Sequence, residues 1–115
     1  MDRPWLNSYP DGVSADIDIN KYASVVEIFE QSVKQFADQP SFSNFGTTLT
    51  YSEFDDATRA VAAYLQKTLG LEKGDRVAIM MPNLLQNPVS IFGALRAGLT
   101  VVNTNPLYTA RELRH

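Results

Sequence analysis

The sequence contains no cysteine, which excludes a disulfide framework, a thiolate metal site and a cysteine nucleophile. It contains a single histidine, His115, at the last position, and a catalytic triad built on that terminal residue is not expected. An excess of basic residues is also missing. The net charge is −3, and the lysines and arginines are dispersed among acids, so we expect no nucleic-acid partner.

Long apolar runs and phosphate-binding glycine patterns are absent as well. The most apolar stretch, residues 77–85, is interrupted by Pro82 and is too short to cross a bilayer. Neither Gly-x-Gly-x-x-Gly nor the P-loop pattern occurs. With 44% hydrophobic and 20% charged residues, the 115-residue chain has the composition of a globular domain. The lack of cysteine suits a reducing cytoplasm.

The first half of the chain predicts an arm followed by a helix. Residues 1–23 contain prolines and a glycine at short intervals, and we expect them to form an irregular arm without helix or strand. Ser24 and Glu27 have the spacing of a capping box that opens a helix over residues 24–37. The apolar positions of this helix fall three and four residues apart and predict one buried face, made of Val26, Phe29, Val33 and Phe36.

A hairpin and a second helix are expected next. Two short strand-like runs within residues 42–51 are joined through Gly46 and predict a β-hairpin. Ser52 and Asp55 have capping-box spacing, which predicts a helix over residues 52–69 that ends at Gly70. Its expected buried face is formed by Phe54, Ala57, Val61, Leu65 and Leu69.

The second half predicts a βαβ unit. Residues 76–81 and 99–103 are almost continuously apolar, as expected of parallel strands covered on both faces. Between them lies a helix over residues 84–97, in which Pro88 either causes a kink or is the first residue after an Asn87 cap. The fold class is therefore α/β, a partial N-terminal subdomain with a β-hairpin and a βαβ unit.

Candidate ligand-binding residues follow the two strands of this unit, because ligands of parallel sheets bind beyond the carboxyl ends of strands. They are Pro82 and Asn83 after the first strand and residues 103–108 after the second. Turn formation and helix capping are the interpretation that we favour for them. Gly93 and Gly98 lie in or just after a helix, where packing and capping explain them better than a nucleotide loop.

Two further groups of residues have structural explanations. Glu53, Asp55 and Asp56 cluster at a predicted helix N-terminus, which favours acids, and this explains them better than a metal site or an acid/base pair. Trp5 and Tyr9 are interpreted as aromatics that hold the arm against its own domain.

The C-terminal residues predict a helix that the chain does not complete. Thr109 and Glu112 have capping-box spacing, and only three residues follow them. We therefore expect the chain to be the front part of a longer protein. Missing downstream strands would then leave apolar surface and a sheet edge exposed.

Several segments together resemble the adenylate-forming superfamily of acyl-CoA synthetases. The resemblance is carried by residues 49–54, 74–83, 93–98 and 101–113, in this order and spacing. Residues 5–10, with 29–33 and 38–40, are similar to the start of bacterial long-chain fatty acid–CoA ligases. Agreement extends over essentially the whole chain.

The resemblance implies a two-step ligase that joins a fatty acid to coenzyme A through an acyl-adenylate, with ATP, CoA and Mg²⁺ as cofactors of the parent enzyme. The family's phosphate loop, its nucleotide-binding residues and its catalytic lysine have no counterpart here. We therefore assign no catalytic, cofactor-binding or metal-binding residue, and expect the fragment alone to be inactive. Residues 1–23 would be an N-terminal arm, and residues 24–115 the incomplete start of the AMP-binding domain.

The resemblance also implies a cytoplasmic enzyme with a fatty acid as its partner, and it leaves open peripheral contact with the inner membrane and a homodimer of the parent. The alternative interpretation is a stand-alone, non-catalytic α/β binding or interaction module. The two interpretations differ in whether the reading frame continues into a Ser/Thr/Gly-rich loop.

Overall fold

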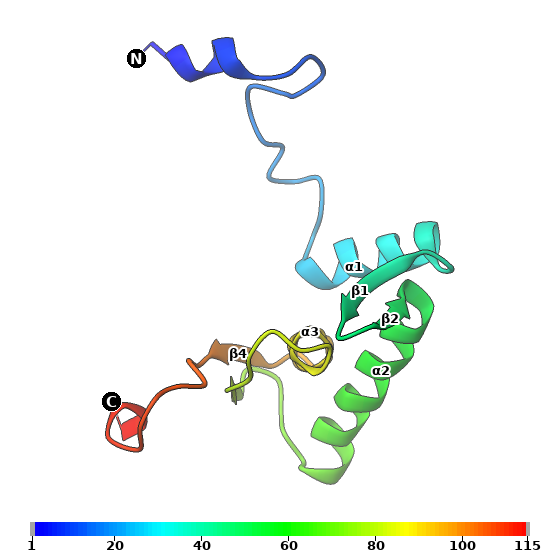
Figure 1. Cartoon of the computed structure of the whole chain (residues 1–115), viewed down its shortest axis with the longest axis vertical. Helices are drawn as coiled ribbons and strands as arrows, with labels where there is room; N and C mark the ends of the chain where they lie inside the picture. The colour runs from blue at the N-terminus through cyan, green and yellow to red at the C-terminus, as the bar shows by residue number, and fades with distance from the viewer. Residues whose placement is uncertain (1, 115) are drawn as a thin grey trace.

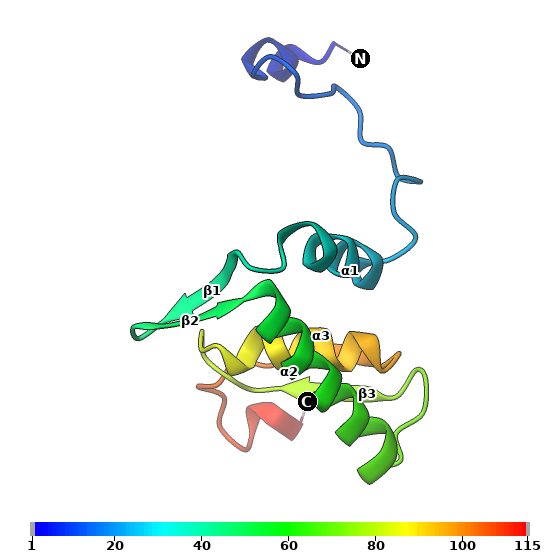
Figure 2. The same cartoon turned by 90° about the vertical axis from the view of Figure 1, so that its right-hand side faces the viewer.

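The structure of the chain, a computed structural model, describes residues 2–114. Figure 1 shows an extended N-terminal arm that leads into a mixed α/β body. Within the body, helices α1, α2 and α3 pack with two separate two-stranded sheets, β1–β2 and β3–β4 (Figure 2). The α/β fold class predicted from the sequence is confirmed.

The arm contains a short 3-10 helix, η1 (Pro4–Ser8), so the prediction that no element forms there is wrong. Pro4 is the first residue of η1, where the fixed φ of proline suits a helical turn and its missing N–H is not needed. An ion pair of 2.6 Å joins Arg3 Nη1 to Asp16 Oδ1 within the arm. The remainder, up to residue 23, contains turns and bends only.

Helix α1 (Val25–Phe36) confirms the helix predicted over residues 24–37. The Ser24 side chain accepts a hydrogen bond from Glu27 N, and Glu27 Oε2 accepts one from Ala23 N. These two bonds satisfy backbone donors that have no partner inside the helix. Phe29 is the one buried residue of α1, and the other residues of the predicted face are half-buried.

Strands β1 (Pro40–Asn44) and β2 (Thr47–Thr50) form the predicted hairpin, with Phe42 opposite Leu49. The two residues of its turn, Phe45 and Gly46, have φ values of 47° and 79°. Two positive φ values define a type I′ turn, whose twist matches that of the flanking strands. The first of these positions normally holds asparagine, aspartate or glycine, so Phe45 adopts a strained backbone conformation.

Helix α2 (Tyr51–Ala63) begins one residue earlier than predicted, and its N-cap is Thr50 rather than Ser52. Thr50 and Glu53 form a complete capping box: Glu53 N donates to Thr50 Oγ1, and Thr50 N donates to Glu53 Oε2. The spacing of a capping box occurs twice here, in Thr50–Glu53 and in Ser52–Asp55. The first pair forms the cap because β2 ends at Thr50.

The end of α2 continues as a π-helical turn, η2 (Tyr64–Thr68), before Gly70 with φ of 67°. The wider turn rotates the residues that follow it, so Leu69 is 52% exposed and does not belong to the buried face as predicted. The buried residues along α2 and η2 are Phe54, Asp55, Thr58, Ala62 and Leu65.

The βαβ unit is confirmed. Strand β3 (Arg76–Ile79) pairs in parallel with β4 (Thr100–Asn103), and α3 (Gln86–Arg96) connects them. Pro88 is the third residue of α3, so the alternative in which Asn87 is the cap and Pro88 the first residue is wrong. Proline is tolerated there because the first-turn N–H groups have no partner within the helix.

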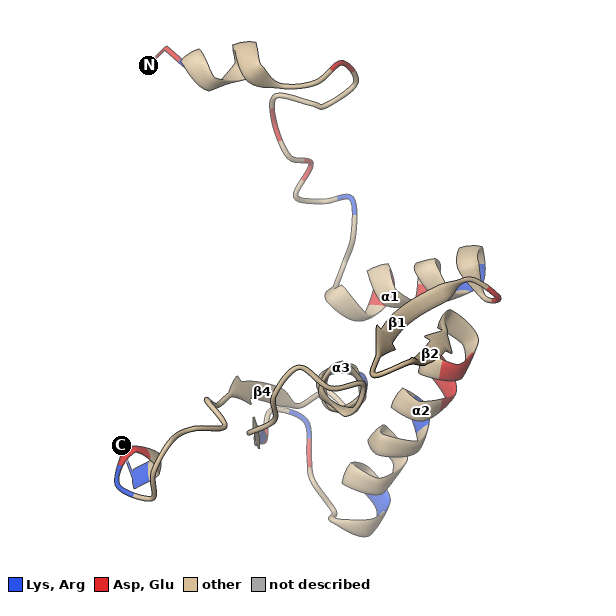
Figure 3. Cartoon of the chain, in the orientation of Figure 1, with Lys and Arg blue, Asp and Glu red and all other residues tan. Residues whose placement is uncertain are grey.

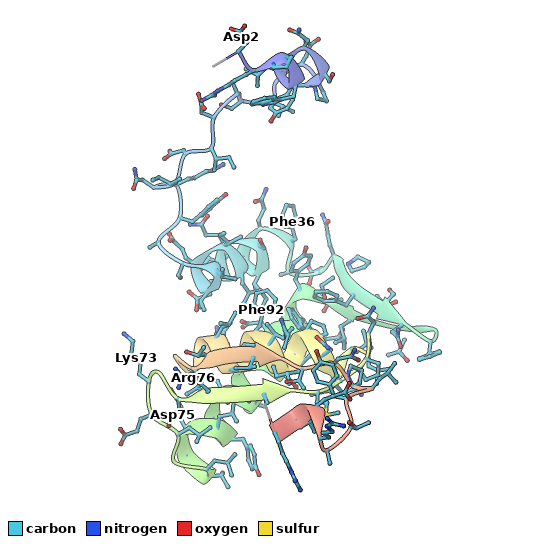
Figure 4. All side chains as sticks on the ribbon, turned by 90° about the vertical axis from the view of Figure 1, so that its left-hand side faces the viewer. Asp2, Phe36, Lys73, Asp75, Arg76 and Phe92 are labelled. Carbon is cyan, nitrogen blue, oxygen red and sulfur yellow. The ribbon has the colours of Figure 1, made fainter. Side chains whose placement is uncertain are left out.

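Two side-chain clusters hold the body together. The aliphatic cluster joins α2 and η2 to α3, β3 and β4; its buried members are Ala62, Leu65, Ala94, Ala97 and Leu99. The aromatic cluster joins α1 and the hairpin to α2 and α3 through rings whose centroids lie between 4.8 and 5.6 Å apart; its members are Phe29, Phe42, Phe54 and Phe92. Phe92 lies between α1 and α3 in Figure 4.

One face of the β3–β4 sheet is open, which confirms the prediction that apolar surface is left exposed where further strands are missing. Ile79 is buried and Val77 packs against the aliphatic cluster, on the side where α3 lies. The alternate positions, Ala78, Met80 and Val102, are exposed. No described element covers them, because α2 and α3 both pack on the opposite side.

Candidate functional surface

The carboxyl ends of β3 and β4 lie side by side, as the parallel register requires. Ile79 is the register partner of Asn103, and Thr104 N donates to Ile79 O at 2.9 Å. The loops that follow, residues 80–85 and 104–108, therefore leave the sheet at the same edge. This edge is where a ligand of a parallel sheet would bind.

The loop after β3 is held in place from two directions. Asn87 Nδ2 in α3 donates to Met81 O at 3.1 Å, and Asn44 Nδ2 in the hairpin donates to Asn83 O at 3.1 Å. The prediction that Asn87 caps α3 is wrong, since it lies inside the helix and its side chain reaches back to the loop. These two amides join the hairpin to the βαβ unit.

A groove of about 340 Å³ lies where these parts meet, and we call it the hairpin groove. It is lined by residues 42–44 of β1, by residues 83–85 of the loop after β3, and by Asn87 and Pro88 at the start of α3. Its walls carry amide, hydroxyl and apolar groups but no lysine or arginine. A groove of this kind cannot neutralise a phosphate chain.

The candidate polar residues after β4 make local turns, which confirms the interpretation favoured from the sequence. Asn105 Oδ1 accepts a hydrogen bond from Leu107 N at 3.0 Å, an Asx turn. Thr104 Oγ1 donates to Val102 O at 3.3 Å. The Tyr108 side chain is 45% exposed.

Gly93 and Gly98 have the packing and capping roles that the sequence predicted. Gly93 lies against α2, where a Cβ at this position would come within 2.6 Å of Val61 Cγ1. Gly98 follows the end of α3 with φ of 80°, a left-handed conformation that ends helices.

The three clustered acids of α2 have different roles. Glu53 belongs to the capping box and Asp56 is exposed. Asp55 is 8% exposed and binds two arginines, so its assignment to the helix N-terminus is wrong. Asp55 lies beyond the first turn, since the helix starts at Tyr51 rather than after Ser52, and from there it faces α3.

Asp55 is the centre of a charged cluster between α2 and α3, which we call the Asp55 cluster. Arg59 Nε donates to Asp55 Oδ2 at 2.6 Å, and Arg96 Nη2 donates to Asp55 Oδ1 at 2.5 Å. The hydrogen bond and the charge of Asp55 raise the pKa of Arg59 above its ordinary value. The sequence analysis treated the basic residues as dispersed, and these two converge. The four-residue spacing of Asp55 and Arg59 was a visible signal, whereas Arg96 lies 41 residues from Asp55.

Figure 3 shows that the other charges of the chain are spread over the arm, α1, α2 and the turns. Lys73 and Asp75, labelled in Figure 4, lie in the turn before β3, and Arg76 is the first residue of that strand. Within residues 2–114, no group of three or more His, Asp or Glu side chains is placed to hold a metal ion. His115 lies outside the described residues.

The arm aromatics do not hold the arm against the body, so that interpretation is wrong. Trp5 is 53% exposed and Tyr9 is 42% exposed, and Figures 1 and 2 show the arm extending away from α1. The hydrogen bonds of η1 are local, for example from Leu6 N to Arg3 O. In the described part of the chain, no helix has the length and hydropathy needed to cross a membrane.

Comparison with solved structures shows which class of protein has this arrangement of a hairpin and a βαβ unit. The N-terminal subdomain of Klebsiella oxytoca NpsA, in complex with anthranilyl-AMSN, superimposes with a TM-score of 0.76 and 26% identity, over 79% of this chain and 24% of that one. A benzoate CoA ligase from Burkholderia xenovorans LB400 gives a TM-score of 0.68 and 27% identity, over 73% of this chain and 17% of that one. The hairpin and βαβ unit thus have the fold that begins an adenylate-forming enzyme.

Residues 29–115 match the family described as AMP-binding enzyme, and the chain belongs to this family. It is 58% identical over 115 residues to a long-chain-fatty-acid–CoA ligase of Escherichia coli O6:H1, and 49% identical over 113 residues to that of Haemophilus influenzae. A ligase of the same name from Bacillus subtilis is 40% identical over 114 residues. These matches cover 98 to 100% of this chain, which spans about a fifth (20%) of the length of each relative.

Proposed function

We propose that the chain forms the N-terminal part of an ATP-dependent long-chain fatty acid–CoA ligase. The observation that carries the proposal is 58% identity to such a ligase over all 115 residues, with no unmatched segment. In the proposed reaction, the fatty carboxylate attacks the α-phosphorus of ATP to give acyl-adenylate and pyrophosphate. The thiol of coenzyme A then displaces AMP and gives the acyl-CoA.

The described residues do not fit ATP, Mg²⁺ or CoA, and we derive no step of the reaction through them. The hairpin groove has no cation, and Arg59 and Arg96 are already paired with Asp55. Transfer to AMP requires groups that neutralise the phosphates and hold the carboxylate in line. We therefore propose that this part supports the fold, and that the reacting groups belong to the rest of the enzyme.

The open face of the β3–β4 sheet supports this structural role. Val102 in β4 and Met80 directly after β3 expose apolar side chains on a two-stranded parallel sheet. Parallel sheets are normally covered on both faces. We propose that further segments of the complete enzyme cover this face and extend the sheet.

The experiment is a comparison of the complete reading frame with the 115-residue chain. The complete protein should release pyrophosphate from ATP in the presence of Mg²⁺ and palmitate, and should form palmitoyl-CoA when CoA is added. The chain alone should release none above background. Palmitate-dependent release of pyrophosphate by the 115-residue chain alone would contradict the assignment of the reacting groups to the rest of the enzyme.

The same comparison distinguishes the alternative of a stand-alone binding or interaction module. That alternative requires a reading frame that ends at His115 and a chain that folds as a stable monomer. A frame that continues into a Ser/Thr/Gly-rich loop, with fatty-acid-dependent activity, excludes it. A complete protein without this activity would overturn the proposed function.

We also propose that the complete enzyme works in the cytoplasm, either free or in peripheral contact with the inner membrane, and that it forms a homodimer. The absence of cysteine supports a reducing compartment. Cell fractionation and light scattering on the complete protein test the location and the dimer. Recovery of the protein from an oxidising compartment would contradict the cytoplasmic location. A monomer at all protein concentrations would contradict the homodimer.

A further inference from the structure

Arg96, the last residue of α3, contacts the other two helices of the body. Its Nη2 donates to Asp55 in α2 at 2.5 Å, and its Nη1 lies 3.6 Å from Glu30 Oε1 in α1. The guanidinium carbon lies 5.3 Å from the centroid of the Phe29 ring, also in α1, in a cation–π arrangement. The Arg96 side chain is only 12% exposed, so these contacts form largely away from water.

Helix α1 has few other attachments along its N-terminal half. Phe29 is its one buried residue and packs against Phe54 and Phe92. The aliphatic cluster includes no residue of α1, so α2, α3 and the β3–β4 sheet form a core without it. The contacts of Phe29 and Arg96 are therefore the aromatic and ionic contacts that join this half of the helix to α2 and α3.

The C-terminal end of α1 is attached differently, through the backbone. Ser52 N donates to Ala37 O at 2.9 Å, and Tyr51 N donates to Gln39 O at 3.0 Å. The Phe36 ring also lies 5.9 Å from the Tyr51 ring. This end is tied to the start of α2 by bonds that do not involve Arg96.

From these two kinds of attachment we infer that α1 moves as a rigid helix about residues 37–40, which act as a hinge. The contacts of Arg96 hold α1 against α2 and α3 in the closed position, and we call Arg96 the latch. Release of the latch lets the N-terminal end of α1 move away from Phe54 and Phe92. Residues 2–23 precede this end of α1 and are joined to it through Ser24, so the latch also sets the position of the arm (Figure 1). The inference does not depend on the ligase activity.

Hydrogen exchange of the complete protein tests the latch, because local opening is measured element by element. Arg96→Met keeps an unbranched side chain beside Phe29 but removes the charge. We expect about tenfold faster exchange in residues 25–36, with a much smaller change in residues 86–103. An equal increase in both segments, or none in residues 25–36, would overturn the proposal.

The matched control is Arg59→Met, which removes the other arginine of the same carboxylate but no hydrogen bond or ion pair to α1. It should leave exchange in residues 25–36 unchanged, and an increase equal to that of Arg96→Met would contradict the latch.

If Arg96→Met does not fold, Glu30→Gln replaces it, since this change removes only the ion pair to α1. That variant should still speed exchange in residues 25–36 about twofold, and an unchanged rate would overturn the proposal.

A distance measurement separates hinge motion from local unfolding. Gln31 in α1 and Ala60 in α2 are exposed, and residues 1–115 contain no cysteine. In the complete protein, with every cysteine of the remaining sequence replaced by serine, Gln31→Cys and Ala60→Cys provide sites for a pair of spin labels. With Arg96 in place, we expect one narrow distance distribution. Arg96→Met should add a second, longer distance. Faster exchange with an unchanged distance would show that α1 unfolds in place, which contradicts the hinge.

Discussion

Gly93 of α3 lies so close to Val61 of α2 that a Cβ on Gly93 would come within 2.6 Å of Val61 Cγ1 and 3.2 Å of Thr58 O. The approach places Ala94 and Ala62 in the aliphatic cluster. We expect Gly93→Ala to lower the free energy of unfolding by about 2 kcal/mol, because one methyl group forces two packed helices apart. Denaturant titration measures the change.

Removal of the contacting methyl groups provides the control for this prediction. Val61→Ala alone should be destabilising, since it leaves a small cavity. In the Gly93→Ala background the same change should be less costly than in the original chain, because the two substitutions compensate. Strictly additive effects would show that the side chain of Val61 does not limit the approach of α3.

Replacement of Asp55 should be among the most destabilising single changes. Asp55→Asn leaves the largely buried guanidinium of Arg96 without its nearest charge partner, with only Glu30 at 3.6 Å remaining, and we expect a loss of about 3 kcal/mol in the free energy of unfolding. Arg59→Gln removes the solvent-exposed partner, 61% exposed, and should cost less than about 1 kcal/mol. Similar losses for the two variants would contradict the difference in burial.

Phe45 offers a stabilising substitution. Its ring is 91% exposed and its φ is positive, so Phe45→Asn removes backbone strain without loss of packing. Asn-Gly is the preferred pair for a type I′ turn, and a gain of about 1 kcal/mol is expected. Phe45→Ala should give little or no gain, because alanine retains the unfavourable conformation. A stabilisation by alanine equal to that by asparagine would rule out this explanation.

The open face of the β3–β4 sheet predicts how the isolated chain behaves in solution. Ala78, Met80 and Val102 should bind a hydrophobic dye or drive self-association, as exposed apolar patches do. Met80→Lys should reduce dye fluorescence at equal protein concentration, and Met80→Leu serves as the control that keeps an apolar side chain. A dye-silent monomer with a cooperative melt would indicate that the face needs no cover.

The C-terminal turn should respond to pH through Glu112. Its carboxylate accepts hydrogen bonds from Thr109 N at 2.7 Å and Thr109 Oγ1 at 2.8 Å, and these lower the pKa of Glu112 below its ordinary value of 4.5. The stabilising contribution is therefore complete above pH 4.5 and disappears as the pH falls through the lowered pKa. The Thr109 amide signal in NMR should titrate with a midpoint below 4.5, and Glu112→Gln should abolish this titration.

The order and type of the main elements followed from local patterns in the sequence. The periodicity of α1, the hairpin around Gly46 and the apolar runs of the βαβ unit each reflect interactions between residues close in the chain. These patterns also explain Gly98 and Asn105, whose roles are set by the backbone of their own turn. Local physical chemistry decides such features, so the sequence was sufficient to predict them.

Two of the errors have a different origin, since they depend on contacts or constraints from outside the local pattern. Thr50 and Ser52 each have an acid three residues later, and the end of β2 selects Thr50. The burial of Asp55 depends on Arg96, far along the chain. A periodic pattern indicates that a side chain is apolar but contains no information on which neighbour covers it.

The arm has a consequence for optical work on this protein. Trp5 is the only tryptophan in the sequence, and it lies in η1, while the body contains tyrosine and phenylalanine. Tryptophan emission of the chain therefore reports the surroundings of the arm alone, whereas circular dichroism follows α1, α2 and α3. Two signals from one unlabelled sample can thus show whether the arm and the body change together or in succession.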